Sequence, residues 1–492
     1  MQLFSKAALA ATALLTPFLT GPAGASPQAD TEEMYKALAA GYKALATCSA
    51  VFVAGQDKAV VEANELNDIY QDYEPYLNDV SDANIDERQR VVSVRFDFDR
   101  PPRLAVHRLG MGCALLPVGA TPKASDWLQT YAGLKPDKSR DVSTALGDRV
   151  MLTTNTIALD RLNAPISFAF DGQTYGEGTR TSAVVLVHKG EVIAEQYDRG
   201  IDADTPQRTW SVAKSLTSTV LGAAMQQGLI GLDNEALISA FNRGGDPRRS
   251  ITLRNALNMV TGLESGESGS RTDRIYFGGV ATMDMLPARA LEEAPGTRFK
   301  YSNYDTLLAM RYLREAIDND PTYHRFPYDA VLNVIGARST VLETDWLGDF
   351  VSSSQVWMTA RDMARIGQLY LQNGQWAGQQ ILHPDWIEFV RTPAPDQPIG
   401  TELRYGGSFW LMGHLDGIPE DTIAALGSRG QIMVVVPEHE LVIVRRGFDP
   451  VGGNRFDAIA FTRDISAVMQ QLENQRIQEE ATRLLRERQE NE

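Results

Sequence analysis

Residues 210–228 read WSVAKSLTSTVLGAAMQQG, and this stretch decides which fold the chain can adopt. Between Ser211 and Gln227 it contains no proline and a single glycine, and it ends at Gly228. This pattern predicts a buried helix that a glycine terminates. Ser211 and Lys214 stand three residues apart, so the first turn of the helix would present both side chains on one face.

Two predicted β-hairpins bracket this helix in the sequence. β-Rich runs cover 183–187 and 192–197 before it, and 432–436 and 441–444 after it. Apolar residues then recur at helical spacing in a closing helix: Ile465, Val468, Met469 and Leu472. This order predicts an α+β fold in which helices cover a sheet whose central strands come from the end of the chain.

The Ser211–Lys214 pair has the composition of an activated nucleophile. A serine hydroxyl attacks poorly unless a base takes its proton, and a desolvated lysine has its pKa lowered enough to act as that base. The start of a helix adds N–H groups and a positive dipole end for a developing oxyanion. S-x-x-K alone is a weak signal, because about one match is expected by chance in such a chain. The alternative is a capping serine with a surface lysine.

A second motif, Tyr301-Ser302-Asn303, follows ninety residues after the serine. A phenol beside an ammonium group loses its proton more readily and can serve as a base, while the Asn303 amide can hold both the lysine and a substrate carbonyl. Tyr76-Leu77-Asn78 also fits Y-x-N, but it precedes the serine and lies in another predicted domain.

With these two motifs, the region from about Thr181 to Gln471 resembles the serine β-lactamase and DD-peptidase superfamily. The similarity is greatest to the branch of class C enzymes, esterases and 6-aminohexanoate-dimer hydrolases, and the segments 257–263 and 359–374 add to it. The resemblance implies a β-lactamase/transpeptidase-like fold, an antiparallel sheet flanked by helices with a helical subdomain. It also implies an acyl-enzyme on Ser211, with Lys214 and Tyr301 moving protons.

The third motif of this family, K-T-G or H-x-G, has no K-T-G or H-T-G counterpart. We assign its place to Ser428-Arg429-Gly430-Gln431, before the last strand pair. The backbone N–H groups of Ser211 and Gln431 would then form the oxyanion hole. Arg429 and Gly430 would contact substrate, with Arg429 holding a carboxylate; alternatively, Arg429 pairs with a surface acid. Trp210 and Tyr276 are expected either to line the pocket or to belong to the core.

The beginning of the chain has the features of an export signal. Lys6 precedes an apolar stretch, and Ala23-Gly24-Ala25 is a small-x-small cleavage pattern. We expect residues 1–25 to be a signal peptide and the mature chain to start at Ser26. A membrane anchor is the alternative, but the run is shorter than the roughly 20 apolar residues that cross a bilayer.

Export makes a disulfide between Cys48 and Cys113 the expected state of the two cysteines. Two buried free thiols are the alternative, and a lipid-attachment site at Cys48 is disfavoured because polar residues separate it from the apolar run. Around these cysteines, helices near 31–47 and 60–70 and a hairpin from Val92 through Phe98 to His107 predict a small α+β domain.

We therefore expect four segments: a signal peptide (1–25), a small α+β domain (26–130), a hydrolase domain (131–474) and a charged, solvated helical tail (475–492). The boundary between the two domains is expected within 117–136, and its position there is the least defined.

The composition limits the classes of molecule that this protein is expected to bind. A net charge of -16 disfavours nucleic acid and anionic membranes. The six histidines lack metal-ligand spacing and no Gly-rich phosphate loop is present, so we expect neither metal nor cofactor. The absence of G-x-S-x-G argues against the nucleophile turn of an α/β-hydrolase. The expected partner is a small linear amide or ester. Peptidoglycan peptides or β-lactams are a rival substrate class, and a non-catalytic sensor is a rival function; the oligomeric state stays open.

Overall fold

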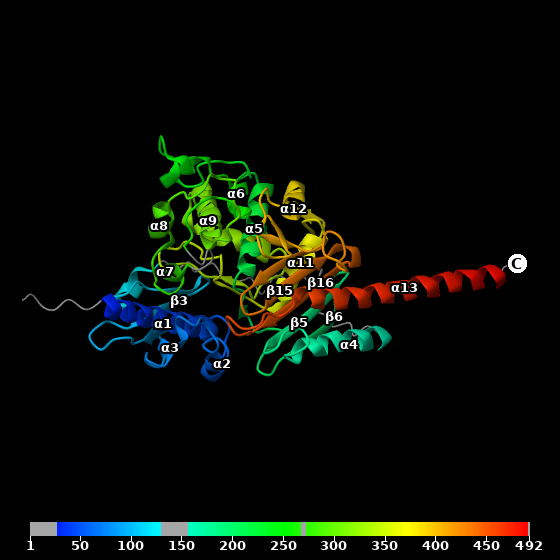
Figure 1. Ribbon diagram of the computed structural model, residues 1–492, viewed down its shortest axis with the longest axis horizontal. Helices are drawn as coiled ribbons and strands as arrows, with labels where there is room; N and C mark the ends of the chain where they lie inside the picture. The colour runs from blue at the N-terminus through cyan, green and yellow to red at the C-terminus, as the bar shows by residue number, and fades with distance from the viewer. Residues whose placement is uncertain (1–26, 129–155, 267–271, 491–492) are drawn as a thin grey trace, which may run out of the picture.

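The computed structural model describes residues 27–128, 156–266 and 272–490. A seven-stranded antiparallel sheet lies at its centre, in the order β12-β13-β14-β15-β16-β5-β6 (Figure 1). Its strands are β5 (Thr181–His188), β6 (Glu191–Tyr197), β12 (Arg404–Gly406), β13 (Phe409–Leu411), β14 (Ile423–Gly427), β15 (Gln431–Val436) and β16 (Leu441–Gly447). Both expected hairpins are confirmed, as β5–β6 and β15–β16. Since β16 pairs with β5, the end of the chain supplies the central strands, as predicted.

Helices cover both faces of this sheet. Successive side chains of a strand point to opposite faces. Val184 and Leu186 therefore pack on α4 (Thr156–Phe170) and α13 (Ala458–Glu490). Val185 points the other way, into the core that contains α5 (Val212–Gln226) and α11 (Ala360–Leu371). The predicted helix after Ser211 is thus confirmed, and Gly228 ends it with a positive φ of 71°.

A helical region lies between α5 and α11 and carries the second motif. Its helices are α6 (Leu253–Leu257), α7 (Asp273–Tyr276), α8 (Thr282–Met285), α9 (Asn303–Ile317) and α10 (Asp320–Pro327). A short sheet, β7 (Gln207–Arg208), β9 (Val356–Met358) and β8 (Val341–Leu342), connects it to the start of α5. Between α11 and β12 lie β10 (Gln375–Trp376), β11 (Gln379–Gln380) and α12 (Pro384–Arg391).

The N-terminal part is an α+β layer. It contains α1 (Pro27–Phe52), α2 (Lys58–Ala63), α3 (Glu74–Leu77) and a four-stranded sheet of β1 (Asn84–Asp86), β2 (Val91–Val94), β3 (Arg103–Arg108) and β4 (Gly112–Leu115). Two expectations need correction here. The second helix, expected near 60–70, covers Lys58–Ala63. The strand that was expected to reach Phe98 ends at Val94, because the Asp97 side chain accepts from the N–H groups of Asp99 and Arg100 in a turn. Phe98 is consequently 93% exposed.

This layer is packed tightly against the rest of the molecule. Tyr42, Tyr73 and Met111 belong to the same core cluster as α5. The buried guanidinium of Arg103 donates to four carbonyl oxygens, two in its own layer and two at Phe277 and Gly278. The expected α+β unit therefore shares its core with the hydrolase region.

The expected disulfide between Cys48 and Cys113 is confirmed and joins α1 to β4. Beside it, the buried Glu343 accepts from Ser49 Oγ (2.7 Å) and from the Cys113 N–H (2.8 Å). Burial raises the pKa of Glu343 to about 7. These contacts fix the disulfide-linked layer against the segment that precedes β9.

Two expected boundaries remain to be placed. α13 runs unbroken from Ala458 to Glu490, so no change of structure occurs at 475. The predicted signal peptide and the boundary at 131 lie outside the described residues. Within the described ranges, no helix has both the length and the apolar character needed to cross a membrane.

Candidate active site

The chain places Ser211 by a tight turn between β7 and α5. Thr209 N–H donates to Val356 O in the neighbouring strand at 2.8 Å, and the next residue, Trp210, has a φ of 49°. A left-handed conformation is unfavourable for a bulky residue, costing on the order of 1–3 kcal/mol, so the surroundings must hold it. The Arg208 guanidinium lies 3.8 Å over the Trp210 ring. Ser211 follows as the N-cap of α5, partly exposed.

Lys214 lies directly below this serine. Its Nζ is 3.2 Å from Ser211 Oγ, 2.6 Å from Asn303 Oδ1 and 2.9 Å from Ser353 O. The residue is 1% exposed and burial lowers its pKa to about 7. A substantial fraction of the amine is therefore neutral near pH 7 and can accept the serine proton.

Tyr301 comes from the segment just before α9. Its hydroxyl interacts with Ser211, and Lys214 Nζ lies 5.0 Å from the ring centroid. Burial raises the pKa of Tyr301 to about 12, although the hydrogen bond with Ser211 opposes this shift. This direction is opposite to the expectation that the phenol loses its proton readily, because desolvation outweighs the hydrogen bond with Ser211. Near neutral pH the phenol keeps its proton and can donate it.

Asn303 connects the lysine to a ring of buried polar groups. Its Nδ2 donates to Thr272 Oγ1 at 2.8 Å while its Oδ1 accepts from Lys214. Tyr276 Oη bonds to Ser353 Oγ and also contacts Thr272. Since Ser353 supplies the carbonyl that accepts from Lys214, the ring closes on the lysine. These partners hold the amine in place without adding a carboxylate, and burial remains the cause of its lowered pKa.

The strand beside the nucleophile is β14. A Cβ added at Gly427, the last residue of β14, would lie 3.1 Å from Ser211 N and 2.6 Å from Thr209 O. Only a glycine permits this approach. The stretch beside Ser211 is therefore Ala425-Leu426-Gly427 at the end of β14. This moves our assignment of the third motif from 428–430 to 425–427, three residues earlier in the chain.

The residues assigned to the third motif have other roles in the structure. Arg429 is buried, and its guanidinium donates to the carbonyl oxygens of Asn67, Phe448 and Asp449. Arg429 therefore neither faces the serine nor pairs with a surface acid. Its side chain points inward and connects Asn67 of the N-terminal layer to the two residues that follow β16.

The two neighbours of Arg429 also serve the scaffold. Gly430 O accepts from Arg445 Nη1 at 2.9 Å. Gln431 lies in the ladder opposite Gly427, and its side-chain amide donates to Gly447 O and to Arg429 O.

Two further candidates, Trp210 and Tyr276, belong to the core, as the alternative reading held. Tyr76 stacks on Tyr35 in the N-terminal layer, so the second Y-x-N has no part in the site. Sequence reasoning missed Trp410, whose ring stacks on Tyr301 at 5.8 Å and is partly exposed. It lies on β13, far along the chain, and a lone tryptophan carries no motif that could have indicated this.

Among the described residues no group of three or more His, Cys, Asp or Glu is arranged to hold a metal ion.

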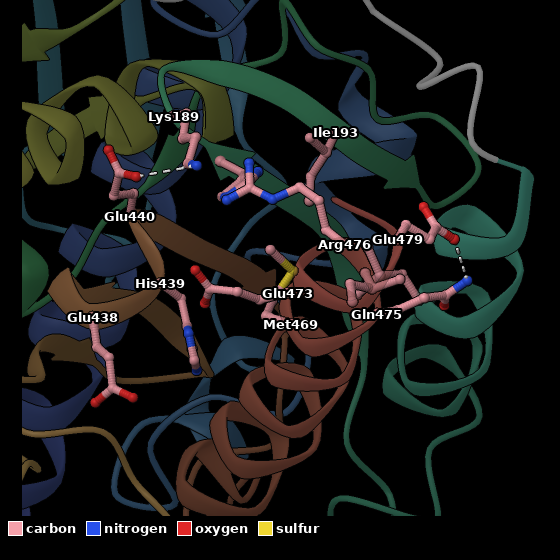
Figure 2. Close-up of a pocket in the computed structure, with 13 residues that line it drawn as sticks. Lys189, Ile193, Glu438, His439, Glu440, Met469, Glu473, Gln475, Arg476 and Glu479 are labelled. Atoms are coloured by element: carbon pink, nitrogen blue, oxygen red, sulfur yellow. Dashed lines mark hydrogen bonds and ion pairs between the residues drawn. The ribbon is translucent and has the colours of Figure 1, made fainter. Parts of the chain in front are cut away.

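A hollow lies away from Ser211, between the β5–β6 turn, the β15–β16 turn and α13 (Figure 2). Lys189 and Glu440 form an ion pair at its rim, at 3.3 Å. It contains none of the residues described around Ser211.

Comparison with known proteins agrees with this geometry. The Beta-lactamase family model matches residues 169–446, more than half of the chain. The 6-aminohexanoate-dimer hydrolase of Paenarthrobacter ureafaciens is 25% identical over 299 residues, covering 55% of this chain and 73% of that protein.

Solved structures agree on the fold. A Bacillus anthracis protein provisionally assigned as a 6-aminohexanoate-dimer hydrolase superposes with a TM-score of 0.52 at 22% identity, covering 60% of this chain and 80% of that one. A penicillin-binding protein homologue from Caulobacter crescentus gives 0.50 at 15% identity, covering 62% and 96%. The chain therefore belongs to the Beta-lactamase family and is a serine hydrolase with a β-lactamase/transpeptidase-like fold.

Proposed function

We propose that this protein hydrolyses a linear amide or ester through an acyl-enzyme on Ser211. The observation that carries the proposal is the buried Lys214 amine, with a pKa of about 7, at 3.2 Å from Ser211 Oγ. An amine in this state takes the serine proton at neutral pH without a histidine or a metal.

The proposed reaction has two halves. Ser211 Oγ attacks the substrate carbonyl carbon while its proton moves to Lys214. The tetrahedral intermediate collapses, and the leaving amine or alcohol receives a proton from the Tyr301 hydroxyl, which Lys214 reprotonates. Water then attacks the acyl-enzyme, gives one proton back to the serine oxygen, and releases the carboxylic acid. One water is consumed and the enzyme returns to its initial state.

The oxyanion hole is proposed to consist of the N–H groups of Ser211 and Ser428. Ser211 begins α5, where the helix dipole favours negative charge. Ser428 is exposed and directly follows Gly427, whose backbone approaches Ser211 N. This choice replaces Gln431, which is paired inside the sheet.

The substrate class follows from what β14 presents. The three residues at the third-motif position, Ala425, Leu426 and Gly427, carry no charge, and the Arg429 guanidinium is engaged by backbone carbonyls. A substrate carboxylate therefore has no cation from this strand. Partly exposed Trp410 and Leu426 favour an apolar acyl chain. We infer a neutral linear ester or amide. The 6-aminohexanoate-dimer hydrolase among the relatives supports only the linear amide bond, because a 6-aminohexanoate dimer itself ends in a carboxylate.

The rival functions receive less support. β-Lactam or peptidoglycan substrates carry a carboxylate that this strand does not bind. A non-catalytic sensor does not require a buried lysine with a lowered pKa beside the serine, since burial of an amine is costly without such a use. We further propose that the protein is exported, on the basis of the N-terminal pattern and the disulfide.

A fluorophosphonate probe tests the proposal, followed by intact-mass analysis and kinetics on a neutral p-nitrophenyl ester, a linear amide and a β-lactam. We expect one adduct on Ser211, none in Ser211→Ala, and turnover of the ester and amide but not the β-lactam. Labelling that persists in Ser211→Ala would refute the nucleophile, and faster turnover of the β-lactam would refute the substrate class.

A further inference from the structure

The second half of α13 projects away from the body of the molecule. In Figure 1 this helix leaves the sheet and continues beyond every other labelled element to the C-terminus. Its first half is covered, with Phe461, Ile465 and Met469 in the core. Further along, Ile477, Leu484 and Leu485 are 57%, 53% and 62% exposed. Large apolar side chains on an isolated helix indicate a contact that one chain alone does not make.

Five residues of this helix form what we term the free stripe: Glu473, Ile477, Ala481, Leu484 and Arg488. They follow one another at spacings of four, four, three and four. At about 100° per residue they occupy one face, within an arc of about 80°. The spacing is that of a helix that pairs with another helix along a narrow seam.

The free stripe is complementary to itself when it is read in reverse. About a point between residues 480 and 481, Ile477 is opposite Leu484, and Glu473 is opposite Arg488. An antiparallel pair therefore places Ile477 on Leu484 and Glu473 on Arg488, while the small Ala481 faces Glu480. A parallel pair would place Glu473 on Glu473 and Arg488 on Arg488, and like charges in contact repel.

We propose that two copies of this protein associate through an antiparallel pairing of their free stripes. The contact is isologous, so it closes as a two-fold dimer. It leaves Ser211 and its partners outside the interface, and it is independent of the proposed reaction.

The surroundings of Glu473 fit the arrival of a basic helix end. The hollow of Figure 2, at the base of the projecting half, is lined by four glutamates, Glu438, Glu440, Glu473 and Glu479, against two cations, Lys189 and Arg476. An antiparallel partner brings Arg488 close to Glu473, the one of these glutamates that belongs to the free stripe. Unlike charges at both ends of the seam select the antiparallel register over others.

Cysteine cross-linking tests the arrangement, because the two native cysteines are joined to each other and an introduced thiol has no competitor. Ile477→Cys and Leu484→Cys are made in separate chains and oxidised mildly, alone and mixed. We expect a covalent dimer only in the mixture, since in the antiparallel pair each residue lies beside the other and about 10 Å along the axis from its own copy. The matched control mixes Glu479→Cys with Thr482→Cys, which are equally disposed about the same point but lie outside the free stripe.

Sedimentation of the unmodified protein supplies the second measurement. We expect a concentration-dependent dimer, and at least a tenfold weaker association for Leu484→Glu, with unchanged ester hydrolysis as the check on folding. A sedimentation coefficient of a monomer at all concentrations would overturn the proposal. Cross-linking of Ile477→Cys to itself, or equal cross-linking in the control mixture, would overturn it as well.

Discussion

Asn303 Oδ1 lies 2.6 Å from Lys214 Nζ, so the hydrogen-bond partner closest to the Lys214 amine is a neutral amide. The position of this oxygen would suit a carboxylate equally well. A carboxylate would hold the lysine in its charged form, which cannot accept a proton, whereas the amide leaves the lowering of the pKa by burial unopposed.

Asn303→Asp therefore should raise the pKa of Lys214 from about 7, by roughly 1 unit or more. The acid limb of the kcat/KM profile for a neutral ester would move to higher pH by the same amount, and activity at pH 7 would fall. Asn303→Ala is the control, because it removes the amide without adding charge and keeps the midpoint near pH 7. Identical midpoints for the aspartate and alanine variants would contradict this account.

Tyr301→Phe is expected to affect amides more than activated esters. A leaving amine needs the proton that the phenol donates, whereas p-nitrophenolate departs without one. We expect a loss of roughly 100-fold or more in kcat on a linear amide, and a clearly smaller loss in the acylation burst with a p-nitrophenyl ester. Equal losses in both measurements would mean that the hydroxyl positions Ser211 and does not donate to the leaving group.

Gly427→Ala should impair catalysis through the backbone. The added Cβ would lie 2.6 Å from Thr209 O, so β14 must move away from the start of α5 and the oxyanion hole opens. We expect kcat/KM to fall by roughly 100-fold, comparable with the loss of one oxyanion donor. Gly244→Ala serves as control, since a Cβ there meets nothing within 4 Å. Full activity in the Gly427 variant would show that the β14 end is not part of the hole.

Arg429→Met is predicted to reduce stability and spare catalysis. It leaves three carbonyl oxygens, those of Asn67, Phe448 and Asp449, without the guanidinium donor. Denaturant unfolding should show a loss of about 3 kcal/mol, with KM for neutral and acidic substrates unchanged in the folded fraction. The exposed Arg199→Met should change little. If Arg429→Met raised KM for acidic substrates alone, Arg429 would bind the substrate carboxylate after all.

The elements predicted correctly are those whose signal is local. The hairpins around β5 and β16 and the helix after Ser211 have short-range periodicity. The spacing of Ser211, Lys214 and Tyr301 is also readable locally, and the structure brings these three residues together. Arg429 was misassigned because its partners, at Asn67 and Phe448, come from opposite ends of the chain. The protonation state of Tyr301 also depends on burial by distant residues such as Trp410 and Tyr405, which no local pattern encodes.

The Arg103 contacts have a consequence for the order in which this chain can fold. During synthesis or export the N-terminal layer emerges first, and its disulfide partners are only 65 residues apart. Two of the carbonyl groups that receive the Arg103 guanidinium follow 174 and 175 residues later. Until they arrive, a cation destined for complete burial has half of its acceptors missing, and closing such a long loop is slow. The early layer must therefore wait, with the side chains of Tyr42, Tyr73 and Met111 uncovered, for the helical region that completes their core.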